Sequence, residues 1–147
     1  MSELTIRAAD FKEDFDEIYT IRDVVYIKGQ DCPYDEEFDG NDKGSEHFLA
    51  YIGGEVVGYC RLRVLEGKAK LERFAVYEQW RGRSIGDALV RHLLAVARER
   101  GIEQKYLYSQ VYAKGFYEKL GFVARGELFM EAGIEHVHMY YDGGAKK

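Results

Sequence analysis

Two arginines and two glycines lie close together near the middle of the sequence, in a pattern suited to anion binding. Arg81, Gly82, Arg83 and Gly86 follow an apolar segment, residues 71–76, and open a segment with helical periodicity. The first N–H groups of a helix lack intrahelical acceptors, and the helix dipole adds partial positive charge there. Glycine lets the backbone approach a ligand closely, and arginine can bind phosphate through two hydrogen bonds. The sequence therefore predicts a phosphate-binding loop between a strand and a helix.

Other known loop types fit this stretch less well. A Walker A loop needs Gly-Lys-Ser/Thr, and a dinucleotide-binding loop needs G-x-G-x-x-G, and neither pattern is present. Residues 82–86 do spell G-x-S-x-G, the nucleophile elbow of serine hydrolases. An elbow serine follows its strand directly, whereas residues 77–81 separate the strand from Ser84. Downstream, Asp87 is one helical turn away and Asp142 follows every histidine, so only a glutamate could act as the acid. The hydrolase is kept as an alternative.

The better match is to the R-x-x-G-x-G/A motif of the GNAT superfamily of N-acetyltransferases, which the loop resembles. Residues 81–86 match that motif with Ser84 at the central glycine, and residues 116–122 (FYEKLGF) resemble a second family segment. Three further segments are similar to the ElaA-like group within the superfamily: 22–26, 30–34 and 131–136. The resemblance implies an α/β fold of GNAT type, in which helices flank a mixed, mostly antiparallel sheet.

The resemblance also implies acetyl-coenzyme A as cofactor and direct transfer of its acetyl group to a primary amine. In that family, strand backbone groups bind the pantetheine arm and the oxyanion, and loop amides bind the pyrophosphate. Carried over residue by residue, the cofactor-binding positions are Phe74, Ala75, Val76, Arg81, Gly82, Arg83, Ser84, Ile85, Gly86, Asp87, Gln110, Ala113 and Phe116. Gln110 replaces the asparagine of typical members, so its coenzyme contact is open. Ser84 keeps its amide, but a left-handed backbone there would be strained.

Acetyl transfer from a thioester benefits from an acid that protonates the departing thiolate. A free thiol has a pKa of ~8.5 and a phenol one of ~10, so tyrosine stays protonated at neutral pH. The resemblance identifies Tyr117 as this acid. Phe116 and Leu120 are expected to face the core from one side of a helix, which would turn Tyr117 toward the rim. The alternative is an amphipathic tyrosine with a packed ring and a hydrated hydroxyl.

Glu72 is one candidate for the general base. It is expected to share a strand face with Phe74 and Val76, and its alternative role is a salt bridge to Arg61 or Arg73. Arg73 is expected on the opposite face, either binding an anionic substrate group or forming a surface pair.

His136 is the second candidate base, because an imidazole pKa of ~6.5 suits proton removal near neutrality. His136 and His138 would point the same way from a strand. No third ligand stands at a recognisable spacing, so no metal is predicted. Arg22 is either a solvated helix residue or a group that reaches the substrate cleft. Cys32 beside Pro33 could carry an acyl group, but a packed thiol fits better because no histidine neighbours it.

Residues 30–46 are rich in acids and contain the only proline. The acids are Asp31, Asp35, Glu36, Glu37, Asp39, Asp42 and Glu46. This segment is either a solvated surface loop or a lid whose acids attract an amine.

The composition sets broad limits. A chain of 147 residues with 46% apolar content predicts one domain, residues 1–147. Its net charge of −5 argues against nucleic acid and mildly favours a cationic substrate. Cys32 and Cys60 are expected as free thiols, and the absence of a signal peptide or apolar span predicts a cytoplasmic protein without a membrane partner. The acceptor is a small-molecule or protein amine, a homodimer is left open, and the alternative function is a non-catalytic acyl-coenzyme A sensor.

Periodicity and turn signals predict the order of the elements. Strands are expected at 4–8, 47–52, 55–64, 70–76, 105–109, 122–124 and 137–141; helices are expected from Asp10 to Gly29, over 83–100 and over 113–120, with a loose tail at 143–147. The glycine pair at 53–54 predicts a hairpin, and the three strands between residues 47 and 76 are expected to form an antiparallel meander.

Overall fold

The computed structural model describes residues 3–142, so the predicted tail lies outside the described residues. Its strands are β1 (Leu4–Ala9), β2 (Glu46–Ile52), β3 (Glu55–Leu65), β4 (Lys68–Val76), β5 (Lys105–Gln110), β6 (Phe122–Glu131) and β7 (Ile134–Tyr141). Its helices are α1 (Phe15–Arg22), the π-helix η1 (Asp23–Lys28), α2 (Tyr34–Glu37), α3 (Ile85–Glu99) and α4 (Lys114–Lys119), with single 3₁₀ turns at η2 (Glu78–Trp80) and η3 (Val111–Ala113).

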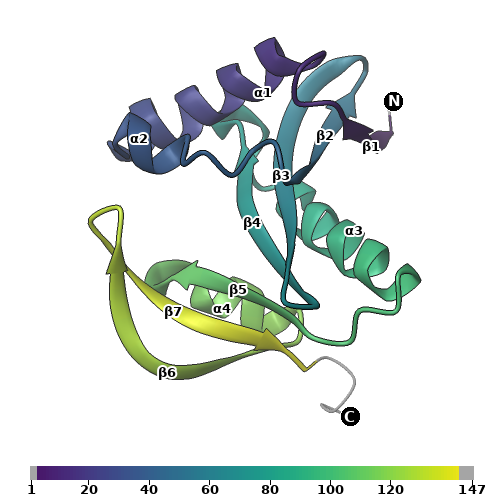
Figure 1. Cartoon of the computed structure of the whole chain (residues 1–147). Coiled ribbons are helices and arrows are strands. Elements are labelled where there is room, and N and C mark those ends of the chain that lie inside the picture. Colours follow the sequence, from purple (N-terminus) through teal and green to yellow (C-terminus); the bar gives the residue numbers. More distant parts are fainter. Residues whose placement is uncertain (1–2, 143–147) are drawn as a thin grey trace.

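The strands form one mixed sheet in the order β1-β2-β3-β4-β5-β7-β6. β2 to β4 make the predicted antiparallel meander, β1 pairs antiparallel with β2 at its edge, and β4 and β5 are parallel. Figure 1 shows that β5, β6 and β7 turn away from the first four strands. The α/β fold predicted from the sequence is confirmed.

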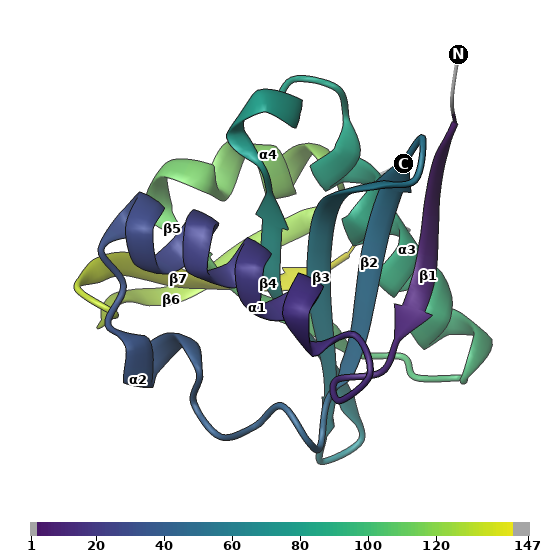
Figure 2. The ribbon, with the colours of Figure 1, turned by 90° about the horizontal axis from the view of Figure 1, so that it is seen from above.

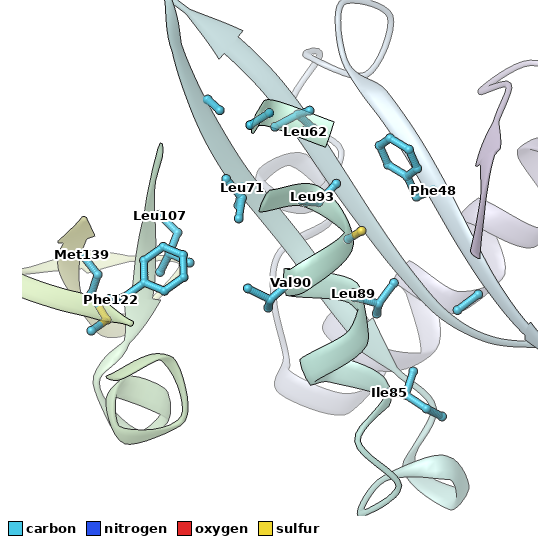
Figure 3. Close-up of a cluster of buried hydrophobic side chains, with 14 of the residues drawn as sticks. Phe48, Leu62, Leu71, Ile85, Leu89, Val90, Leu93, Leu107, Phe122 and Met139 are labelled. Atoms are coloured by element: carbon cyan, nitrogen blue, oxygen red, sulfur yellow. The ribbon is translucent and has the colours of Figure 1, made fainter. Parts of the chain in front are cut away.

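Helices cover both faces of the meander (Figure 2). α3 packs on one face, where Ile85, Leu89 and Leu93 meet residues from β2, β3 and β4. Figure 3 shows Ile85, Leu89 and Leu93 along α3, and the same cluster continues to Leu107, Phe122 and Met139 in the C-terminal part of the chain. α1 covers the opposite face through a smaller cluster: Ile18, Ile21, Val25, Leu49, Tyr59 and Ala75. The core therefore fixes the start of α3 beside the end of β4.

A bulge in β4 changes which side chains share a face. The register between β3 and β4 shifts there, and Arg73 has a positive φ of 61°. Leu71 before the bulge and Phe74 after it both belong to the α3 side of the sheet, which strict alternation forbids. The prediction that Glu72 shares a face with Phe74 and Val76 is therefore wrong, since the extra residue inverts the alternation.

Two element predictions also need correction. The C-terminal strands are longer than the expected 122–124 and 137–141, because residues 131–134 form a tight turn in which Ala132 and Gly133 have positive φ. The first helix contains a π-helical segment, Asp23–Lys28. The first helix also begins at Phe15 and not near Asp10, although the Asp10 carboxylate accepts the N–H groups of Lys12 and Glu13 at 2.9 Å in the turn before it.

Both cysteines, Cys32 and Cys60, are buried thiols that form no disulfide with each other. Within residues 3–142, the helices are too short or too polar to cross a membrane.

Candidate active site

The candidate active site lies where strands β4 and β5 diverge. The two strands pair only at Ala69 with Lys105 and at Lys70 with Tyr106. Beyond Lys70 the second half of β4 has no partner in β5, so this sheet position is open. A cavity of about 260 Å³ lies at the opening, lined by residues of η1, α2, β4, β5, β7 and α4. The sequence could not place this divergence, because it depends on strand direction rather than on strand pattern.

Tyr117 lines this cavity and packs on Phe74 with ring centroids 6.2 Å apart. Burial raises the pKa of Tyr117, so the phenol is protonated at neutral pH. The helix faces differ from the prediction, however. Phe116 is 40% exposed and its ring lies near Gly86 at the start of α3, whereas Tyr117 packs against the core. Phe116 was therefore wrongly predicted to face the core, because α4 is turned so that Tyr117 faces inward.

The backbone of β4 next to the cavity is fixed by Tyr26. The Tyr26 hydroxyl donates a hydrogen bond of 2.5 Å to the Phe74 carbonyl, directly after the bulge. Tyr26 comes from η1, and burial raises its pKa well above the ordinary value. π-helical segments are frequent at functional sites. Tyr26 was not predicted as a site residue, because a π-helical segment has no sequence periodicity by which it could be recognised.

Glu72 is tied into ion pairs. Its carboxylate accepts Arg61 at 2.8 Å, Arg63 at 2.8 Å and Lys70 at 2.9 Å. Burial would raise its pKa, but the Arg63 hydrogen bond and the charges of Arg61 and Lys70 outweigh burial and lower the pKa to about 2. A carboxylate with so low a pKa is a weak proton acceptor near neutrality. These contacts favour the salt-bridge interpretation of Glu72 over the general-base interpretation.

His136 is buried and lines the same cavity. Its Nδ1 lies 2.7 Å from the Ile134 carbonyl, and its ring stacks on Phe129. Because a carbonyl only accepts hydrogen bonds, Nδ1 carries the proton and the neutral ring has its lone pair on Nε2. His136 therefore has the tautomer that a base acting through Nε2 requires. Among the residues the structure describes, no group of three or more His, Cys, Asp or Glu could hold a metal ion.

The 81–87 loop has the predicted anion-binding shape. Ala88 makes the first helical bond, donating to the Ser84 carbonyl at 3.1 Å, so the amides of residues 85–87 precede the helical ladder. Gly82 and Ser84 have positive φ values of 82° and 63°, which confirms the expected left-handed strain at Ser84. The side chains of Arg81, Gly82, Arg83 and Ser84 are exposed, Ile85 is buried, and Asp87 pairs with Arg91. Within the described chain neither Arg81 nor Arg83 pairs with a carboxylate.

Arg81 and Arg83 are held by uncharged neighbours. Arg81 Nε donates to the Val76 carbonyl at 3.1 Å, and the Arg83 guanidinium lies 4.7 Å from the ring centroid of Trp80, the only tryptophan. Both cationic groups are therefore positioned without being neutralised.

Arg22 does not reach the cavity. It is fully buried, its Nε donates to Glu37 at 2.6 Å, and its Nη1 donates to Asp42 at 2.7 Å. The prediction of a substrate contact is therefore corrected, since two acids and the Phe38 ring, 4.5 Å away, surround the guanidinium.

Arg73 and the acidic segment also differ from expectation. Arg73 Nε lies 3.2 Å from Glu37, and its Nη2 lies 3.1 Å from Asp39, which also pairs with Arg61, the partner of Glu72. Arg73 thus reaches the same charge cluster as Glu72, and the predicted opposite placement is wrong, because the bulge redirects its side chain.

We name the connected charges the ion-pair network. Its members are Arg22, Glu37, Asp39, Asp42, Arg61, Arg63, Lys70, Glu72 and Arg73. Three acids of the 30–46 segment therefore neutralise arginines instead of facing a substrate. Neither the solvated-loop nor the acidic-lid interpretation describes them, and the network holds α2 against the sheet.

Gln110 lies at the cavity but is engaged elsewhere. Its Nε2 donates to Gln30 Oε1 at 2.9 Å, across the opening between η1 and β5. Ala113 also lines the cavity. Sequence reasoning missed Gln30, Lys70 and Tyr108 as cavity residues, because none belongs to a recognisable motif.

The comparisons with known proteins agree with this geometry. The acetyltransferase (GNAT) domain family matches residues 28–142 of the chain. The chain belongs to the GNAT acetyltransferase family. The N-acetyltransferase YjcF of Bacillus subtilis is 33% identical over 132 residues, covering 89% of this chain and 94% of YjcF.

ElaA of Escherichia coli is related in both sequence and structure to this GNAT acetyltransferase. The ElaA sequence is 31% identical over 127 residues, covering 81% of each protein. The ElaA crystal structure superposes with a TM-score of 0.83 and 25% identity, covering 94% of this chain and 99% of ElaA. The resemblance to the ElaA-like group is thereby confirmed. A second structure, the PaiA N-acetyltransferase of Thermoplasma acidophilum in complex with coenzyme A, has a TM-score of 0.73, 17% identity and coverage of 95% and 99%, which shows the shared fold.

Proposed function

We propose that this protein transfers an acetyl group from acetyl-coenzyme A to a primary amine by direct attack. The observation that carries the proposal is the parting of β4 from β5 beside Tyr117, because it leaves strand backbone groups free at a cavity with a protonated phenol. Membership of the acetyltransferase family and the coenzyme A found with the Thermoplasma relative support acetyl-coenzyme A as the donor.

In this proposal the coenzyme diphosphate binds the amides of residues 85–87 and the side chains of Arg81 and Arg83. Phe74, Ala75 and Val76 offer their backbone to the pantetheine arm and to the oxyanion of the tetrahedral intermediate. Phe116 and Ala113 flank the arm from the α4 side, and Gln110 contacts it only if its bond to Gln30 opens. The chain of residues 1–147 acts as one domain.

Proton transfer is assigned to two groups. His136 Nε2, directly or through one water, removes a proton from the ammonium form of the acceptor, and the neutral amine then attacks the thioester carbonyl. As the C–S bond of the tetrahedral intermediate breaks, Tyr117 donates its proton to the departing thiolate, which leaves as coenzyme A, and the cationic nitrogen of the new amide gives up its extra proton to the Tyr117 phenolate. Glu72 has two alternative roles: it is a base that acts through water, or it is a structural member of ion pairs. A pH–rate profile distinguishes them. An acid limb that is unchanged in His136→Ala would exclude His136 as base.

Thiol release from acetyl-coenzyme A across a panel of amines and peptides tests the proposal. We expect release with at least one amine, and a fall in turnover of about 10²-fold or more in Tyr117→Phe with nearly unchanged coenzyme affinity. Coenzyme binding without release across the panel would favour the non-catalytic sensor. Full activity of Tyr117→Phe would remove the phenol from the mechanism.

A further inference from the structure

The ion-pair network leaves positive charge in excess at one end of the cavity. The Glu72 carboxylate forms ion pairs with three cations, Arg61, Arg63 and Lys70. Arg61 has Asp39 and Asp42 as further partners. For Arg63 and Lys70, Glu72 is the one carboxylate within ion-pair distance in the described part of the chain.

Lys70 presents this excess charge to the cavity. It lines the cavity, and its Nζ lies 4.2 Å from the ring centroid of Tyr108, another lining residue. Of the three N–H donors of the ammonium group, one is directed to Glu72 and one side faces the ring, which leaves a donor for a further partner.

The positive charge continues on the same surface of the sheet. Lys68 lies two residues before Lys70 on β4 and so projects from the same face. Burial lowers the pKa of His138, and the charges of Lys70 and Lys68 lower it further. Arg125 adds a cation 5.4 Å from the ring centroid of Tyr140. Glu103 and Asp142 line the same neighbouring hollow as Lys68 and Arg125, so the charge that favours an anion at the cavity is that of Lys70 beside the Tyr108 ring.

Nearby acids do not offset this charge. The network engages Glu37, Asp39 and Asp42 with Arg22, Arg61 and Arg73. The remaining lining carboxylate, Glu131, belongs to the other end of the cavity, since it pairs with Ile134 on β7 whereas Tyr108 pairs with His138.

We propose that the acceptor amine also carries an anionic group, a carboxylate or a phosphate, which binds Lys70 beside the Tyr108 ring. Its amine then lies toward Phe74 and Tyr117, along the open half of β4. The inference rests on the proposed function and specifies its substrate class. The acceptor then has mixed charge, which adds an anionic group to the cationic amine that the net charge mildly favours.

Matched acceptors test the inference through thiol release from acetyl-coenzyme A. The series contains ω-amino acids from glycine to 6-aminohexanoate, the amide of each, the plain alkylamine of each length, and 2-aminoethyl phosphate. We expect kcat/KM to be at least tenfold higher for the best anionic amine than for its amide or alkylamine. Comparison of carboxylate with phosphate then identifies which anion is preferred.

Variants assign the effect to Lys70. In Lys70→Met the preference for the anionic amine over its amide should fall about tenfold, mainly through KM, and Lys70→Arg should retain most of it. Lys12→Met is the control. It removes an exposed lysine that is distant from Lys70 in the sequence, so the preference should stay unchanged. Quenching of Trp80 fluorescence by coenzyme A shows whether each variant is folded and binds the cofactor.

The outcomes separate the two proposals. Equal or better turnover of amides and alkylamines, or an unchanged preference in Lys70→Met, would overturn the anionic-acceptor inference while leaving the acetyltransferase proposal intact. Coenzyme binding without thiol release from any compound would overturn the proposed function, and the inference with it.

Discussion

The 81–87 loop and the ion-pair network hold their charges in opposite ways. Arg81 and Arg83 are exposed and contact a carbonyl and an aromatic ring. In the network, Arg22 and Arg61 are fully buried and each meets more than one carboxylate. An exposed arginine without a carboxylate partner can bind a ligand, whereas a fully buried arginine that contacts two carboxylates fixes structure. Arginines in neighbouring regions of this protein therefore have different roles.

The cost of each arrangement also differs. Burying charges is unfavourable unless every charge is paired, so loss of one member exposes its partners to the full desolvation penalty. An exposed arginine is already hydrated, so its loss affects binding more than folding. Substitutions in the two regions should therefore move different measurements.

The largest effect is expected from Arg22→Met. The change removes one of two cations beside each buried carboxylate: Glu37 loses its contact of 2.6 Å and keeps Arg73, and Asp42 loses its contact of 2.7 Å and keeps Arg61. We expect the free energy of unfolding to fall by about 3–5 kcal/mol in urea denaturation. The matched control is Arg100→Met, which removes a half-exposed pair with Glu46 and should cost less than about 1 kcal/mol. Similar losses in both variants would contradict the contrast between the two kinds of arginine.

The second largest effect is expected when the stability of the protein is measured at decreasing pH. The folded-state pKa of Glu72 is lowered to about 2, so its contribution to stability is present above the unfolded pKa and is lost as pH falls toward 2. The full contribution is on the order of 3 kcal/mol, lost progressively between about pH 5 and pH 2. Urea midpoints measured over this range should fall less steeply in Glu72→Gln. A slope equal to that of the parent protein would show that other carboxylates cause the acid sensitivity.

Local signals made the 81–87 loop predictable. Glycines, arginines and the change from a strand to a helical pattern all lie within a short stretch, and the strain at Ser84 followed from its residue type. The meander was predictable for the same reason, because the glycine pair at 53–54 and the alternating strands are local features.

Of the network, the sequence predicted only the Glu72–Arg61 pair, as one of two roles for Glu72, because most of the other pairs join segments that meet only in the folded chain. Arg22 meets Asp42, and Arg61 meets Asp39, only after α1 and the 30–46 segment pack on the sheet. The bulge at Arg73 could not be predicted from the sequence for a similar reason. A positive φ at a non-glycine residue is imposed by its surroundings, here by ion pairs and by the neighbouring Tyr26 bond.

Removing the loop charges should affect binding without affecting folding. Arg81→Gln and Arg83→Gln should each weaken coenzyme A binding by about 3- to 10-fold, because each removes one charge-assisted contact to phosphate. Calorimetry measures the affinity, and Trp80 quenching gives an independent value. The free energy of unfolding should change by less than about 0.5 kcal/mol. A large loss of stability would show that these arginines, too, are structural.

The smallest effect is expected at Ser84, the point where the loop itself is strained. A left-handed backbone costs a non-glycine residue roughly 1–2 kcal/mol, and part of the gain from glycine is offset by its greater freedom in the unfolded chain. Ser84→Gly should therefore raise the free energy of unfolding by less than about 1 kcal/mol and leave coenzyme affinity unchanged. Ser84→Ala keeps the strain but removes the hydroxyl, so the pair separates the two roles. Weaker coenzyme binding in both variants would mean that the hydroxyl contacts the ligand, and that the serine is kept for binding despite the strain.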